Sequence, residues 1–161
     1  MSRTERLVKA SPEAVWAVLA DPDAYAHWVV GSKDIRDADP SWPADGSRFH
    51  HTVGVGPFSI RDHTEVVRAE RPYRLLLHAK ARPAGRAKVE VLLVPRGDDT
   101  LVEMWEEPAS PMARLGHNPV ADTLLHGRNV ESLRRLAELA ESGSRPPLTS
   151  REREGRDRDD G

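Results

Sequence analysis

The chain of 161 residues contains no cysteine. This absence excludes disulfide bonds, thiolate metal ligands and a cysteine nucleophile. An excess of charge of either sign is also missing, because 24 lysines and arginines stand against 26 aspartates and glutamates. Without a strong net field, we expect neither nucleic-acid binding nor stable membrane association.

Long apolar runs are absent as well. No stretch approaches the roughly 20 apolar residues of a membrane-spanning helix, and the N-terminal residues include no apolar stretch long enough for a signal peptide. The sequence therefore predicts a cytoplasmic protein. Its length suits one domain with a real core. A monomer and a homodimer are both compatible with it.

The last part of the chain, residues 143–161, differs in composition from the rest. It is rich in charge, glycine and proline and contains a single leucine. Such a segment cannot bury enough apolar surface to offset the entropy of ordering. We predict a folded domain over residues 1–142 followed by a disordered charged tail, with a partner-binding role of the tail as the alternative.

One strand and two short helices are predicted at the start of the chain. Residues 3–9 alternate loosely between polar and apolar side chains. Ser11-Pro12-Glu13 then supplies an N-cap, a proline in the first turn and an early negative charge. This helix ends at Asp21-Pro22, because the residue before a proline is pushed out of the α conformation. A second short helix follows over residues 21–28.

From residue 33 onward the spacing of apolar residues changes toward a period of two, and turn residues recur at short intervals. The connections are too short for crossover helices, so the strands are expected to be antiparallel. The predicted strands are 33–38, 47–53, 58–69, 73–81, 86–94 and 100–106.

A long helix is predicted over residues 120–141. Its apolar residues recur at intervals of three and four. At ~100° per residue, Asp122, His126 and Asn129 fall on the same inward arc. A helix with this mixed face, lying across a curved antiparallel sheet, leaves a cavity rather than a solid core. The apolar inward residues are Val130, Leu133, Ala137 and Ala140.

Several motifs are similar to those of a known family. They are Ala10 to Trp16 (ASPEAVW), Leu19 to Pro22, Tyr25, Trp28, Gly46, Glu70 to Leu75, Pro95 to Thr100, and Arg128-Asn129 through Leu136. Through them, residues 3–142 resemble the polyketide cyclase/dehydrase-like branch of the START/Bet v 1-like (SRPBCC) superfamily. The resemblance implies an α+β helix-grip fold. In that fold a curved antiparallel sheet of about seven strands wraps around a long C-terminal helix, and two short helices follow the first strand.

The resemblance also implies a function. It implies binding of a small apolar or aromatic molecule, such as a polyketide, lipid or isoprenoid, in a cavity between the sheet and the last helix, without a cofactor. The alternative is a polyketide cyclase, aromatase or dehydratase that uses general acid–base catalysis in that cavity. A third possibility, a protein-interaction module, would need a large exposed apolar patch, and the highly charged sequence argues against one.

Three residues are candidates for catalysis. Asp122 and His126 lie one helical turn apart, so the carboxylate could orient the imidazole toward the cavity. Alternatively, Asp122 only charges the helix N-terminus and His126 bonds to a strand edge. Asp62 is expected to face inward. It is either an acid or ligand anchor in the cavity, or a carboxylate near the solvated end of a twisted strand.

The residues expected to line the cavity come from the sheet, the second short helix and the last helix. For Trp105, the alternation along its strand does not choose the inner face. No metal site is predicted, because neighbouring histidines point to opposite faces of a strand and no ligand spacing appears. The predicted lining residues are Trp28, Phe49, His51, Phe58, Ile60, Leu77, Val89, Val91, Trp105, Asn129, Val130 and Leu133.

Overall fold

The computed structural model describes residues 2–55, 57–81, 85–109 and 119–143, and at 33, 34, 36, 53–55, 58–60, 81 and 121 it describes the backbone alone. The predicted charged tail therefore lies outside the described residues beyond 143, as do the side chains of Phe58 and Ile60. The elements in chain order are β1 (Ser2–Val8), α1 (Pro12–Leu19), η1 (Pro22–Ala24), α2 (Tyr25–Trp28), β2 (Ser32–Ala38), β3 (Arg48–Val55), β4 (Phe58–Glu70), β5 (Arg74–Ala81), β6 (Gly85–Arg96), β7 (Asp99–Pro108) and α4 (Pro119–Gly143).

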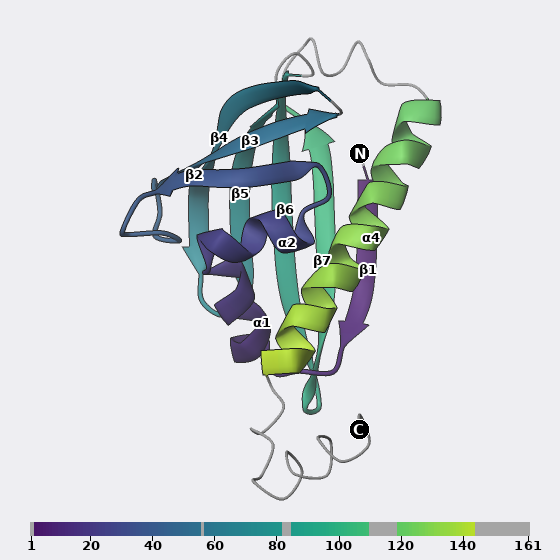
Figure 1. Cartoon of the computed structure of the whole chain (residues 1–161). Coiled ribbons are helices and arrows are strands. Elements are labelled where there is room, and N and C mark those ends of the chain that lie inside the picture. Colours follow the sequence, from purple (N-terminus) through teal and green to yellow (C-terminus); the bar gives the residue numbers. More distant parts are fainter. Residues whose placement is uncertain (1, 56, 82–84, 110–118, 144–161) are drawn as a thin grey trace, which may run out of the picture.

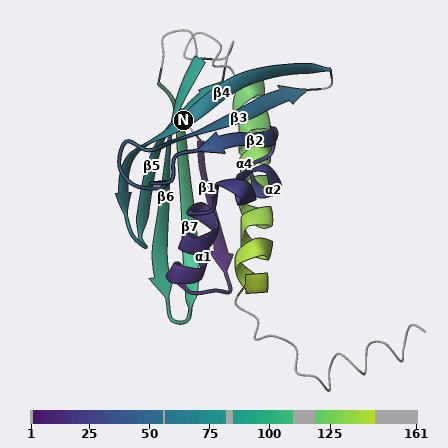
Figure 2. The ribbon, with the colours of Figure 1, turned by 60° about the vertical axis from the view of Figure 1, so that its left-hand side comes forward.

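The strands form one seven-stranded antiparallel sheet in the order β1-β7-β6-β5-β4-β3-β2. In Figure 1, β2, β3 and β4 run across the upper part of the molecule, whereas β6 and β7 run along its length. Helix α4 lies across one face of this curved sheet, with α1 and α2 beside it (Figures 1 and 2). The predicted helix-grip fold is confirmed, with element bounds that differ from the predicted ones by a few residues.

The start of α1 follows from its capping residues. The Ser11 side chain accepts a hydrogen bond from the backbone N–H of Ala14 at 3.2 Å, and Pro12 occupies the first turn. The Asp21 side chain accepts in the same way from the N–H of Asp23 at 3.0 Å and begins η1. These local signals set the succession of α1, η1 and α2. Helix α2 lies over the same face of the sheet as α4 (Figure 1).

Helix α4 has two different inward halves. Leu133, Leu136, Ala137 and Ala140 in its C-terminal half are all buried in the apolar core. Asn129, in the half nearer the N-terminus, is buried as a polar residue. The helix therefore seals the core at one end and presents polar groups to the space beneath it at the other.

An aromatic cluster packs between α2 and the sheet. The Phe49 ring centroid lies 4.4 Å from that of Tyr25 and 4.6 Å from that of Trp42, and the Tyr25 and Trp28 centroids are 4.9 Å apart. Trp42 Nε1 donates to the carbonyl oxygen of Leu19 at 3.3 Å, which ties the cluster to α1. Burial raises the pKa of the Tyr25 hydroxyl above its ordinary value. Tyr25, Trp28 and Phe49 of this cluster form one end of the space under α4.

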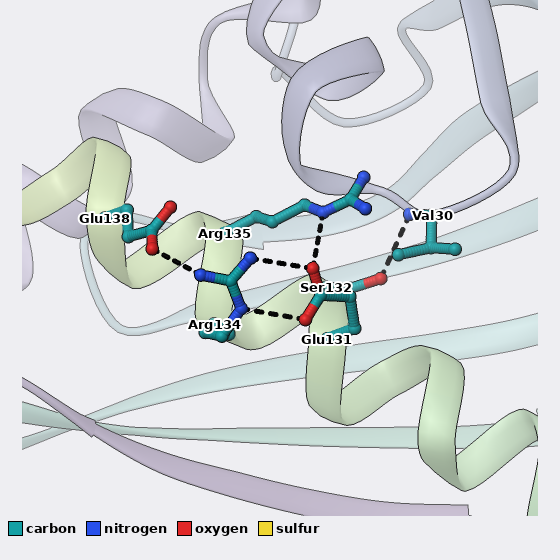
Figure 3. Close-up of polar contacts among 6 residues, drawn as sticks. All are labelled: Val30, Glu131, Ser132, Arg134, Arg135 and Glu138. Atoms are coloured by element: carbon teal, nitrogen blue, oxygen red, sulfur yellow. Dashed lines mark hydrogen bonds and ion pairs between the residues drawn. The ribbon is translucent and has the colours of Figure 1, made fainter.

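On α4, a carboxylate is held by two arginines (Figure 3). Arg134 donates two hydrogen bonds of 2.8 Å to Glu131, and Arg135 Nε donates a third at 2.9 Å. Arg134 also pairs with Glu138. The hydrogen bonds from Arg134 and Arg135 lower the pKa of Glu131 from 4.5 to about 2.

The carboxyl group of Glu131 is therefore expected to titrate near pH 2 in the folded protein. Because the folded-state pKa is depressed, the stability that the pairs contribute is present above about pH 4.5 and is lost as the pH falls toward 2. An NMR titration of the side-chain carboxyl carbon measures this midpoint. Arg135→Gln should raise the midpoint, whereas a midpoint near 4.5 in the unaltered protein would show that the pairs do not form.

Candidate functional site

A cavity of about 130 Å³ lies between the concave face of the sheet and the helices α2 and α4. Residues on five consecutive strands, β3 to β7, form one wall. The connection from α2 to β2 and the middle of α4 form the other. The lining residues on the strands are Phe49, His51, Thr64, Leu77, Ala79, Lys80, Ala87, Val89, Val91, Met104 and Glu106, and those on the other wall are Tyr25, Trp28, Val29, Val30, Gly31, Ser32, Arg128, Asn129 and Ser132.

The strand wall is mainly apolar. Leu77 on β5 pairs with Val89 on β6, so these two side chains project from the same face of the sheet. Val91 and Met104 are a second pair of this kind, between β6 and β7, and both are buried. Such a surface favours an apolar occupant, because contact with it removes apolar area from water on both sides.

A buried carboxylate stands at the α4 side of the cavity. Glu106 is only 8% exposed, and its Oε2 accepts a 2.7 Å hydrogen bond from Arg128 and a 3.0 Å hydrogen bond from Asn129 Nδ2. Its charge is thus balanced by the guanidinium group, as a buried carboxylate requires. The pairing fixes β7 to α4 beside the cavity.

Replacing Asn129 with alanine should therefore destabilise the fold. The change removes one of the two donors to Glu106 and is expected to lower the free energy of unfolding by about 1.5–3 kcal/mol, the range for hydrogen bonds to charged groups. Urea denaturation measures the difference. Val130→Ala, one residue along the same helix at a side chain that is 44% exposed, is the matched control and should change stability little. Equal effects of the two changes on stability would contradict a stabilising hydrogen bond from Asn129 to Glu106.

A second polar pair lies in the strand wall. His51 on β3 and Thr64 on β4 are both buried, with 3.1 Å between His51 Nε2 and Thr64 Oγ1. Asp62 stands opposite His51 in the register of β3 and β4, and it is buried too. Asp62 is not among the cavity-lining residues, however. His51, in contrast, lines the cavity, so its imidazole is in direct contact with that space.

The structure places the predicted pair Asp122 and His126 outside the cavity lining. His126 is exposed, and its Nδ1 lies 3.4 Å from Thr4 Oγ1 on the edge strand β1. This corresponds to the alternative considered from the sequence, a histidine that bonds to a strand edge. The reason is that this part of α4 packs over β1. A side chain that points inward from this part of the helix therefore meets the edge of the sheet and not the cavity.

Three other predicted lining residues also lie outside the cavity. Trp105 faces the opposite side of β7 from Glu106, with the Arg3 guanidinium 4.9 Å from its ring centroid. Val130 is turned by ~100° from the buried Asn129 and is exposed. Leu133 is buried in the core beyond the cavity.

Sequence reasoning missed several lining residues, most of which carry little signal on their own. Ala79 and Ala87 are small residues in strands, and Ser32 follows a turn. Glu106 and Arg128 are charged residues that are normally assigned to the surface. Glu106 shares a face of β7 with Val102 and Met104, which are apolar and buried, but alternation alone left open which face of the strand is inward.

Within the described residues, no group of three or more histidine, aspartate or glutamate side chains could hold a metal ion. No helix in the described part of the chain is long and apolar enough to cross a membrane.

Comparisons with known proteins extend these observations. The model of a family described as polyketide cyclase / dehydrase and lipid transport matches residues 2–141. No curated protein matches the chain. A solved structure of a protein from Rhodobacter sphaeroides is similar with a TM-score of 0.68 and 23% identity, covering 87% of this chain and 91% of that one.

Two further solved structures show the same fold. A protein from Mesorhizobium loti has a TM-score of 0.66 and 20% identity, with coverage of 88% of this chain and 96% of that one. DynU16, a protein in the dynemicin biosynthetic locus, has a TM-score of 0.63 and 22% identity, with coverage of 88% of this chain and 47% of that one. At such identities the likeness establishes the fold alone.

Proposed function

Because the chain belongs to the polyketide cyclase/dehydrase and lipid transport family, we propose that its cavity binds a small apolar or aromatic molecule of the polyketide, lipid or isoprenoid kind. The observation that carries this proposal is the cavity itself. It lies under α4, its strand wall is mainly apolar, and aromatic rings close one end. Cavities of this kind, apolar with a few polar groups, are where small ligands are usually held.

The size of the cavity limits the part of a ligand that it can enclose. An engineered protein cavity of about 150 Å³ holds one benzene molecule. By that comparison, the 130 Å³ here suits about one ring or an equivalent branched chain.

His51 favours a second candidate function, a cyclase, aromatase or dehydratase that acts by general acid–base catalysis. Its imidazole lines the cavity beside Thr64, and histidine is the side chain that most often serves as a general acid or base. It takes the place that the sequence suggested for His126. Under this proposal a bound ketone is converted, and His51→Gln abolishes conversion while the ligand still binds.

Native mass spectrometry of the protein purified from its own host tests the binding proposal. We expect a stoichiometric apolar passenger that is lost on denaturation and is recovered by organic extraction. The same measurement is repeated with excess acetophenone added to the emptied protein. A protein that carries no passenger and forms no acetophenone adduct would contradict the proposal.

A further inference from the structure

Three polar atoms around the cavity have no hydrogen-bond partner in the structure although they are buried. They are Trp28 Nε1, Ser32 Oγ and Arg128 Nε, and each belongs to a residue that lines the cavity. An indole N–H and a guanidinium N–H can only donate, and a serine hydroxyl can donate as well. Buried polar groups normally have a hydrogen-bond partner, so three such donors around one cavity indicate that a bound molecule supplies an acceptor there.

These three donors belong to one side of the cavity. The backbone N–H of Val30 donates to Ser132 Oγ at 3.1 Å, and this bond fastens the connection between α2 and β2 to α4 (Figure 3). Trp28 and Ser32 lie two residues on either side of Val30. Arg128 lies one helical turn before Ser132 on the same face of α4. The bond therefore brings all three residues to the junction of α2, β2 and α4.

The charge at this junction is already balanced. Arg128 is paired with the buried carboxylate of Glu106 at 2.7 Å, and Asn129 donates to the same oxygen. Lys80 also lines the cavity, but it follows Ala79, which pairs with Thr64 on the cavity face, so the Lys80 side chain projects from the opposite face of β5. Among the lining side chains that the structure describes, no lysine or arginine offers a ligand anion an unpaired positive charge to offset its desolvation.

We propose that this junction binds the neutral carbonyl oxygen of an otherwise apolar ligand, which makes the cavity selective for ketones, aldehydes or esters over hydrocarbons and carboxylates. The inference rests on the proposed binding function and adds the chemical class. The carbonyl oxygen accepts from Trp28 Nε1, Ser32 Oγ or Arg128 Nε, and the ring or chain lies against Leu77, Val89 and Val91.

Three ring-sized probes test the proposal by NMR titration. Acetophenone has a carbonyl oxygen, α-methylstyrene has a CH₂ group in its place, and benzoate has a carboxylate. We expect acetophenone to bind about tenfold more tightly than either of the others, as one to two net hydrogen bonds imply. Acetophenone alone should move the indole N–H signal of Trp28, which Trp28→Phe identifies.

Two variants locate the selectivity. Trp28→Phe and Ser32→Ala each remove one donor and keep most of the apolar surface, so each should reduce the ratio of acetophenone affinity to α-methylstyrene affinity, measured within the same variant. Ser32→Ala keeps the test valid if Trp28→Phe disturbs the aromatic cluster. Equal binding of acetophenone and α-methylstyrene would overturn the carbonyl site, with water then satisfying the donors. Tightest binding of benzoate would overturn it too. If no probe binds, the proposed binding function itself fails.

Discussion

Replacing Phe49 with alanine is expected to lower the free energy of unfolding by about 3–5 kcal/mol, the range for removing a buried aromatic ring. Phe49 is 1% exposed and its ring contacts those of Tyr25 and Trp42, with centroids 4.4 and 4.6 Å away. The ring also lines the cavity, so its removal enlarges a space that already exists, and the neighbouring side chains cannot move in to fill it. Urea denaturation, followed by tryptophan fluorescence, measures the change.

Phe49→Leu is the matched control for this prediction. It keeps most of the buried apolar volume but removes the aromatic contacts, so it should destabilise the protein much less than Phe49→Ala. A loss below about 1 kcal/mol for Phe49→Ala would mean that the cluster is not packed as described.

Replacing Ala79 with phenylalanine is expected to abolish binding of acetophenone while the protein remains folded. Ala79 stands between Thr64 on β4 and Ala87 on β6 in the sheet register, and all three line the cavity. A ring at this position would occupy the space of the ligand. Overpacking of a solid core costs about 1–3 kcal/mol, but here the added ring fills existing space, so we expect a stability loss of about 1 kcal/mol or less.

Val67→Phe adds the same ring at an exposed position on β4 and should leave acetophenone affinity unchanged. Isothermal titration calorimetry measures affinity for both variants, and thermal unfolding confirms that both are folded. If Ala79→Phe bound acetophenone as tightly as the unaltered protein, the ligand would have to bind elsewhere.

The fold could be predicted because its boundaries are encoded locally. Ser11 and Asp21 form side-chain caps with residues only two or three positions away, so the helix starts are visible in a short window of sequence. Strand positions followed from alternation and from frequent turn residues. The order from β2 to β7 follows from short connections, which let neighbours in sequence pair. The pairing of β1 with β7 joins the two ends of the strand sequence and has no such local cause.

The site was harder to predict because it depends on where α4 crosses the sheet. Helical periodicity placed Asn129 and His126 on one arc, and only Asn129 reaches the cavity. The turn that carries His126 lies over β1, near Thr4. Periodicity fixes the direction of a side chain but not which element lies beneath it.

The burial of Glu106 shows the same limit. The alternation along β7 left open whether Trp105 or its neighbours face inward. Glu106 lies on the buried face because Arg128 and Asn129, 22 and 23 residues later, supply its hydrogen bonds. That compensation comes from tertiary structure and has no signature within the strand.

An apolar ligand is proposed to enter the space between the sheet and α4. Methyl-labelled protein titrated with acetophenone locates the bound molecule, since NMR reports each methyl group separately. We expect the shifts to concentrate on Leu77, Val89, Val91 and Met104, which line the cavity. Shifts confined to the exposed Val120 and Leu124, or no shifts at all, would contradict it.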